Sequence, residues 1–354
     1  MILKAVFFSG IIIGLAACSG SRALPEEWPL FPDSTASKWW IVNGITTDVG
    51  GDDMHLCLLF SFSPVNGKYY TTFFSSFWWE ADGTYHTGTR SADVPFLPEK
   101  KQFPILLEIP GRDSSELEWY WTLGRKRMRL QCQVREVAGE VLPVSVTMKL
   151  ARKGAFQPLE TVVSSGETPP EAVSMRSDYS NPFFPATYSL PPIATDTRLP
   201  APWKYKAGSL LSVHAIQSGE DLLKITRNNY VGWLDLFLDN GQHLSLLYET
   251  DGKAFFRNLG HNAWFPDGKL RMMPEPQFRA DTSEVWTSPA SGKTFPTKLE
   301  VSFPEVSIFL KIRPRKPEQE NGTGNNALWM GAVETVDPIT GAVSGRGNMY
   351  ILKQ

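Results

Sequence analysis

The sequence predicts an all-β protein built from two halves, and turn chemistry is the main reason. Asn-Gly and Asp-Gly pairs, which are typical of tight hairpin turns, separate runs rich in Val, Ile, Phe, Tyr and Trp along the chain. Helical periodicity is nearly absent, and only the stretch from Glu171 to Ser177, which follows two prolines, suits a short helix. We therefore expect barrels or sandwiches of antiparallel strands.

The clearest hairpin lies in YVGWLDLFLDNGQHLSLLYETDG and turns at Asn240-Gly241. Because side chains alternate along a strand, Trp233, Asp235 and Phe237 share one face of its first arm. Both faces are largely apolar, so we expect the hairpin to be covered on both sides. A carboxylate between two aromatic rings needs a hydrogen-bond partner, water or a ligand. For Asp235 the sequence leaves a structural hydrogen bond and a ligand role both open.

The first eighteen residues, MILKAVFFSGIIIGLAAC, have the pattern of a secretory signal that is too short to span a membrane. Its end, Leu15 to Cys18, resembles the lipobox of bacterial lipoproteins. That resemblance implies cleavage before Cys18 and a lipid on this residue, and Ser19 implies the periplasmic face of the outer membrane. Residues 1–17 are thus the expected signal peptide and residues 18–34 a tether. A secreted chain with an incidental Cys18 is the alternative.

Composition bounds the partners of the mature chain. About 335 residues remain after cleavage, enough for two domains or one large β fold. The 35 Lys plus Arg balance 37 Asp plus Glu, which disfavours nucleic acid as a partner. The chain is rich in aromatic residues, with 12 Trp, 21 Phe and 10 Tyr. Such residues either fill sheet cores or line apolar clefts.

Cysteine and histidine patterns give no sign of a metal or cofactor. Cys57 and Cys132 remain beyond the lipobox, and the sequence leaves open a disulfide between them or two small core residues. The five His show no metal-ligand spacing, and no G-x-S-x-G element is present. We expect no metal and no cofactor.

The two halves are marked by an internal echo. Residues 39–62 repeat the strand, turn, strand layout of residues 232–249. Between the halves, residues 180–202 hold six prolines, which disfavour a central strand. The predicted domains are therefore residues 35–200 and 201–354. Residues 313–326 have nothing apolar to bury and are expected to form a mobile hairpin excursion.

Four segments resemble landmarks of the AttH and carotenoid hydratase (hydroxyneurosporene synthase) family of lipocalin-like proteins. They are KWWIVNG at 38–44, GWLDLFLDNG at 232–241, VWTSPASGKTFP at 285–296 and WMGAV at 329–333. The resemblance implies two lipocalin-like β-barrel domains packed side by side, with an apolar ligand pocket at or near their junction. It places four tryptophans around that junction, where ligand contact and simple packing are both open. These are Trp40, Trp233, Trp286 and Trp329.

The acidic residues of the family pattern are not intact here. Members credited with hydratase chemistry carry an Asp-His-(Glu/Gln) cluster, where an acid would protonate a carbon double bond. The nearest match is His214 followed by Gln217, and no acid adjoins His214. The expected function is therefore a membrane-anchored envelope lipoprotein that binds a hydrophobic small molecule without chemistry. Its expected ligand-binding residues are Trp40, Trp233, Asp235, Phe237, Trp286 and Trp329.

Two alternatives stay open. One is a hydratase, isomerase or cyclase that acts on a polyene or isoprenoid-like substrate, with His214 or Asp235 as proton carrier. The other is a carbohydrate or cell-envelope interaction protein whose Trp residues stack on sugars. For the binding protein, an ABC-type exporter is a candidate partner, and the membrane is the partner of lipidated Cys18.

Overall fold

The structure is a computed structural model that describes seventeen separate ranges of the chain. The described ranges are 37–47, 52–65, 68–80, 83, 85–94, 105–109, 119–123, 127–136, 141–149, 155–157, 173–181, 210–218, 228–265, 270–271, 273–281, 284–321 and 327–353. Within them every regular element is a β-strand except one 3-10 turn at Pro304–Val306. The predicted all-β class is confirmed. No helix in these ranges is long and apolar enough to cross a membrane.

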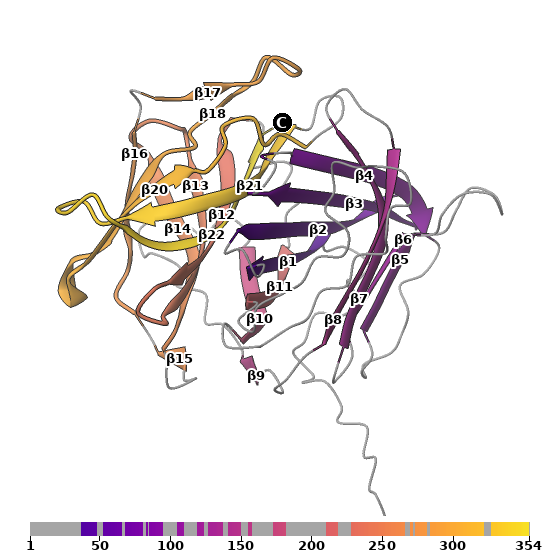
Figure 1. Ribbon diagram of the computed structural model, residues 1–354, viewed down its shortest axis with the longest axis horizontal. Helices are drawn as coiled ribbons and strands as arrows, with labels where there is room; N and C mark the ends of the chain where they lie inside the picture. The colour runs from indigo at the N-terminus through magenta and orange to yellow at the C-terminus, as the bar shows by residue number, and fades with distance from the viewer. Residues whose placement is uncertain are drawn as a thin grey trace, which may run out of the picture.

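The first sheet has eleven strands in the described ranges. They are β1 (Ser37–Thr47), β2 (Asp53–Val65), β3 (Lys68–Trp79), β4 (Tyr85–Val94), β5 (Ile105–Ile109), β6 (Trp119–Leu123), β7 (Arg127–Glu136), β8 (Val141–Lys149), β9 (Ala155–Gln157), β10 (Val173–Asn181) and β11 (Leu210–Ser218). Their order is β5-β6-β7-β4-β3-β2-β1-β11-β10-β9, with β8 beside β7. Strands β5 to β8 run steeply across β2 to β4, so that β6 faces β2 and β3 (Figure 1).

The second sheet has nine strands in the described ranges, in the order β15-β14-β13-β12-β22-β21-β20-β19-β16. They are β12 (Tyr230–Leu238), β13 (His243–Thr250), β14 (Phe256–Trp264), β15 (Leu270–Arg271), β16 (Gln277–Ala280), β19 (Leu299–Phe303), β20 (Ile308–Pro314), β21 (Ala327–Val336) and β22 (Val343–Lys353), with a small separate hairpin of β17 (Trp286–Thr287) and β18 (Thr294–Phe295). The sheet curls around an apolar core that includes Leu234, Leu246 and Phe295.

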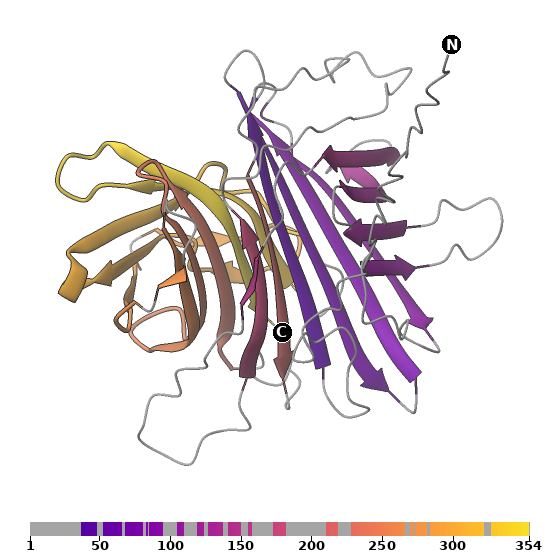
Figure 2. The same ribbon diagram turned by 90° about the horizontal axis from the view of Figure 1, so that it is seen from below.

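The predicted hairpin at Asn240-Gly241 is confirmed, because it joins β12 to β13. Gly241 has a φ of 81°, which a residue without a Cβ adopts most readily. The two curled sheets lie side by side in both views (Figures 1 and 2). Strands β1 to β3 pack against β12, β21 and β22 through a second apolar cluster, which includes Ile41, Trp233 and Met330. We call this contact the junction.

Two predictions about the middle of the chain need correction. The expected helix over Glu171 to Ser177 is wrong, because strand β10 begins at Val173 and pairs with β11. A neighbouring strand thus overrides a weak local helix signal. Strand β11 itself lies between β1 and β10, so the change from first to second sheet comes after Ser218 rather than near residue 200. The signal peptide, the tether with Cys18, and residues 182–209 lie outside the described residues.

The polar segment after β20 is packed rather than mobile as far as residue 321. Gln319 is completely buried, and its amide donates to the carbonyl of Ala332 at 3.0 Å while its oxygen accepts from the Ala332 N–H at 2.7 Å. Gln319 lies over Gly331, where a Cβ would approach its Oε1 to 2.1 Å. Asn321 reaches the first sheet and donates to the Ser75 carbonyl at 2.9 Å. The predicted excursion is therefore wrong for residues 313–321, and residues 322–326 lie outside the described ranges.

The two cysteines do not pair. Cys57 and Cys132 are both buried free thiols. Cys57 lies beside Ser76 and Cys132 beside Ser75, and neighbouring residues of a strand face opposite sides of the sheet. Burial raises the pKa of each thiol to about 12. Of the two possibilities, the structure selects two small core residues.

Candidate functional site

Asp235 of β12 is completely buried and is bonded across the junction to β1. Asn43 of β1 donates its amide to Oδ2 at 2.7 Å. Ser245, directly opposite on β13, donates its hydroxyl to Oδ1 at 2.7 Å, and Nε2 of His243 lies 2.5 Å from the same oxygen. Both carboxylate oxygens are thus bonded by protein groups. Of the two roles left open by the sequence, the structure shows the hydrogen-bonded one.

The polar contacts continue from Asn43 into both sheets. The hydroxyl of Tyr350 donates to Oδ1 of Asn43 at 2.7 Å. Asn348, opposite Asp235 on β22, lies with its Oδ1 2.9 Å from Nδ1 of His55. Burial lowers the pKa of His55 to about 4, and it raises the pKa of Tyr350 well above its usual value. These neutral side chains therefore act as hydrogen-bonding links between the sheets.

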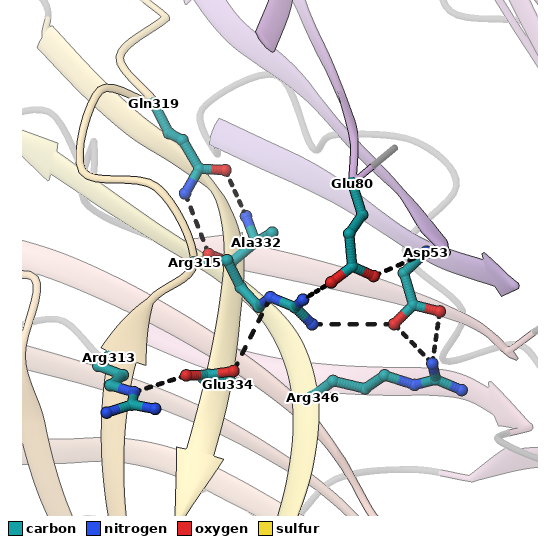
Figure 3. Close-up of polar contacts among 8 residues, drawn as sticks. All are labelled: Asp53, Glu80, Arg313, Arg315, Gln319, Ala332, Glu334 and Arg346. Carbon is teal, nitrogen blue, oxygen red and sulfur yellow. Dashed lines mark hydrogen bonds and ion pairs between the residues drawn. The ribbon is translucent and has the colours of Figure 1, made fainter. Parts of the chain in front are cut away.

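A cluster of ion pairs also links the two sheets (Figure 3). Nη1 of Arg346 on β22 lies 2.5 and 2.6 Å from the two oxygens of Asp53 on β2. Arg315 binds Glu80 of the first sheet and approaches Glu334 at 3.8 Å. The backbone N–H of Asp53 also donates to Glu80 at 3.0 Å. Acids of the first sheet thus meet arginines of the second.

The predicted ligand-binding residues occupy separate places. Trp233 is buried in the junction, and Phe237 stacks on His243 with ring centroids 4.5 Å apart. Trp329 instead lies in the core of the second sheet and donates its indole N–H to the Pro317 carbonyl at 2.8 Å. Trp286 packs against the same core and stacks on Phe295.

The expectation that these tryptophans gather at the junction is therefore wrong for Trp286 and Trp329. Strand alternation explains Trp329, because its neighbours Leu328 and Met330 are the residues that face the junction. The backbone of Trp40 pairs with Phe60, and that of His214 with Ile41. Both of these side chains lie outside the described part of the structure.

The geometry at Asp235 does not form a nucleophilic triad. Ser245 donates to the carboxylate at 2.7 Å, whereas its hydroxyl lies 3.4 Å from Nε2 of His243. Such a triad needs serine bonded to histidine and histidine bonded to the acid. Among the described residues, no group of three or more His, Cys, Asp or Glu side chains could hold a metal ion.

An aromatic cluster inside the first sheet was not singled out by sequence reasoning. Phe60 and Phe73 stack at 4.0 Å, Phe60 lies 6.0 Å from Trp121, and Phe73 meets Trp119 edge-on at 5.4 Å. All four are buried. The Arg90 guanidinium lies 5.9 Å from the Trp119 ring. The alternation in EWYWTL, with tryptophans at 119 and 121, is the signal that could have revealed this face.

Trp119 is the residue of this cluster whose polar atom bears on function. The indole N–H of Trp119 is buried and makes no hydrogen bond with the residues that the structure describes. A buried donor without an acceptor is costly, by about 1 to 3 kcal/mol. An oxygen atom brought by a ligand would remove that cost.

Comparisons with known proteins identify the fold. No protein-family model and no curated protein sequence matches the chain. Among solved structures, it is similar to a putative AttH from Nitrosomonas europaea, with a TM-score of 0.64, 15% identity, and coverage of 94% of this chain and 97% of that one. It is also similar to kievitone hydratase from Nectria haematococca, with a TM-score of 0.60, 13% identity and 95% of both chains covered. At these identities the likeness concerns the fold, so the chain has the lipocalin-like fold of AttH-type proteins that its four sequence landmarks predicted.

Proposed function

We propose that the protein is a lipid-anchored envelope protein that binds an apolar small molecule and performs no chemistry on it. The observation that carries this proposal is the aromatic cluster of the first sheet, with its unsatisfied Trp119 N–H. Ligand pockets are mostly apolar and aromatic, with a few polar groups that fix orientation. The ligand class that fits is an apolar molecule with one hydrogen-bond acceptor, such as a carbonyl or hydroxyl oxygen.

The first sheet is a better candidate for this site than the junction. At the junction, Asp235 already accepts from Asn43 and Ser245, and Tyr350 already donates to Asn43. A ligand there would have to replace protein hydrogen bonds with its own, which gains little. At Trp119 a ligand oxygen would gain a bond without breaking one.

The anchor rests on the lipobox ending at Cys18. Each buried CH₂ adds about 0.8 kcal/mol, so several acyl chains hold a domain at a membrane essentially permanently. Cys18→Ser should move the protein from the membrane fraction to the soluble fraction or leave it unprocessed. Equal membrane recovery of this variant and the native chain would remove the anchor from the proposal.

Binding is tested with two apolar probes that differ in one feature. Retinal carries a carbonyl oxygen, whereas diphenylhexatriene is a pure hydrocarbon, and their affinities are measured by direct titration and by competition. Trp119→Phe keeps an aromatic ring but removes the N–H. Because one hydrogen bond contributes about 0.5 to 1.5 kcal/mol, the variant should bind retinal about 2- to 12-fold more weakly and diphenylhexatriene as before.

Trp286→Phe is the matched control, since Trp286 packs against the second core, and it should change neither affinity. Failure of the native protein to bind either probe would reject the proposed function. An equal loss of both probes in Trp119→Phe would reject the role of the indole N–H.

A second candidate function is hydration or isomerisation of a polyene. Its support is the fold shared with kievitone hydratase and the buried contact between Asp235 and His243. Mass spectrometry of retinal recovered after incubation separates the two functions. Unchanged mass and absorption support the binding protein, and a gain of one water or a shifted absorption that Asp235→Asn abolishes supports the enzyme.

A further inference from the structure

The outer face of the second sheet is hollowed where β16, β19 and β20 run side by side. Two hollows open there, with volumes of about 390 Å³ and 720 Å³. Both are lined by Phe278, Arg279 and Glu300, so they adjoin. The first extends over Phe309 and Pro338, and the second over Lys253 and Asp281. We call the two hollows together the outer groove.

Strand pairing arranges the side chains of the outer groove in two rows. In one row Arg279, Glu300 and Lys311 lie opposite one another on β16, β19 and β20. The next row places Gln277 and Ser302 in line with the aromatic ring of Phe309. Alternation explains why all six point outward, because the residues between them, such as Val301 and Leu310, fill the core. The groove is therefore a ladder of polar side chains beside one aromatic platform.

Most polar side chains in these two rows make no side-chain hydrogen bond or ion pair within the described part of the chain. Within the described ranges, the side chains of Gln277, Arg279 and Ser302 make no hydrogen bond or ion pair that the structure records. Glu300 has one loose partner, Lys311, at 3.5 Å. Phe309 is 49% exposed, although a ring of that size is usually buried. Donors, an acceptor and an apolar ring thus face solvent together.

We propose that the outer groove binds an oligosaccharide. A sugar ring has an apolar C–H face that can stack on Phe309 and hydroxyl groups that can pair with amide, guanidinium and carboxylate groups. An apolar ligand would leave the polar rows unpaired, and a nucleic acid would need a much more basic surface.

The charge of the outer groove indicates which kind of oligosaccharide it prefers. The groove has three basic side chains, Lys253, Arg279 and Lys311, against the two acids Asp281 and Glu300, which leaves one excess positive charge. The planar guanidinium of Arg279, shared by both hollows, can bind a carboxylate through two parallel hydrogen bonds. The preferred ligand is therefore a saccharide with one carboxylate. This site is independent of the apolar site at Trp119.

The test uses two disaccharides that differ in a carboxylate. N-acetylglucosaminyl-N-acetylmuramic acid has one and chitobiose has none, and calorimetric titration of the full chain gives both affinities. The native protein should bind the acidic disaccharide more tightly. Phe309→Ala should weaken both by about tenfold or more, whereas Arg279→Gln should weaken the acidic disaccharide more than chitobiose and so remove the preference between them.

Tyr70→Ala is the matched control, because Tyr70 is 46% exposed on the first sheet, and it should change neither affinity. A melting temperature for each variant confirms that it is folded. The proposal is overturned if neither disaccharide binds, if Phe309→Ala leaves both affinities unchanged, or if an unglycosylated acidic pentapeptide binds more tightly than the disaccharides.

Discussion

The second sheet has two polar surfaces that differ in how their side chains are used. At the junction, Asp235 is buried and both its oxygens accept hydrogen bonds from protein groups. In the outer groove, Arg279 and Gln277 are exposed and make no recorded side-chain bond within the described ranges. A buried polar group needs a hydrogen-bond partner inside the protein, whereas an exposed one can bond to water or to a ligand. The polar residues at the junction therefore stabilise the fold, and those in the outer groove are available to bind a ligand.

Unfolding experiments test this difference between the two surfaces. The largest loss of stability is expected for a substitution of Trp233. Trp233→Ala removes a buried ring from the junction cluster and should lower the free energy of unfolding by about 3 to 5 kcal/mol. Urea denaturation measures this. A loss below about 1 kcal/mol would show that the junction contributes little to stability.

A pH titration tests the neutral state of His55. Burial and the cations Arg315 and Arg346 lower its pKa to about 4, against the opposing effects of Asp53 and Asn348. Between pH 6.5 and about 4 the unfolded chain binds a proton that the folded chain does not, so stability falls as pH drops through that window. The loss should be on the order of 3 kcal/mol. The difference in unfolding free energy between native protein and His55→Gln should therefore change across this window, and a constant difference would contradict the buried neutral state.

Tyr350→Phe tests a single link of the junction. The change keeps the ring but leaves Oδ1 of Asn43 without its donor, so unfolding free energy should fall by about 1 to 3 kcal/mol. Tyr70→Phe on the exposed surface should change it by less than about 0.5 kcal/mol. If both changes lowered the free energy of unfolding equally, the buried hydrogen-bonded hydroxyl of Tyr350 would contribute no more to stability than the exposed hydroxyl of Tyr70.

The smallest effects on stability are expected in the outer groove. Arg279→Gln and Phe309→Ala remove no recorded hydrogen bond, and each should shift the free energy of unfolding by less than about 0.5 kcal/mol. Thermal melts check this. If either variant lost about 2 kcal/mol or more of its free energy of unfolding, these side chains would contribute to folding stability, which would contradict a role in ligand binding alone.

Local patterns in the sequence predicted the strands well, since the turn at Asn240-Gly241 and the alternation around it depend on neighbouring residues. They could not predict the bond between Asn43 and Asp235, which are 192 positions apart, because it depends on how two sheets pack. Composition also failed at Gln319, since a polar side chain can be buried when its amide pairs with the backbone.

The same limit applied to the candidate site. Each of the four family-like segments contains a tryptophan, but their side chains do not share one site. Trp329 faces the core of the second sheet, whereas Trp233 faces the junction. The outer groove has no sequence signature at all. Gln277, Ser302 and Phe309 come together only because β16, β19 and β20 pair in one register.

The most direct test of the comparison is Asp235→Asn, measured by thermal melting beside retinal titration. Asparagine puts an N–H₂ group where an oxygen now accepts hydrogen bonds, so the junction should lose about 1 to 3 kcal/mol while retinal affinity of the folded protein stays unchanged. A variant with native stability and a large loss of retinal affinity would contradict the account, because Asp235 would then be a ligand-binding residue and the junction the binding site.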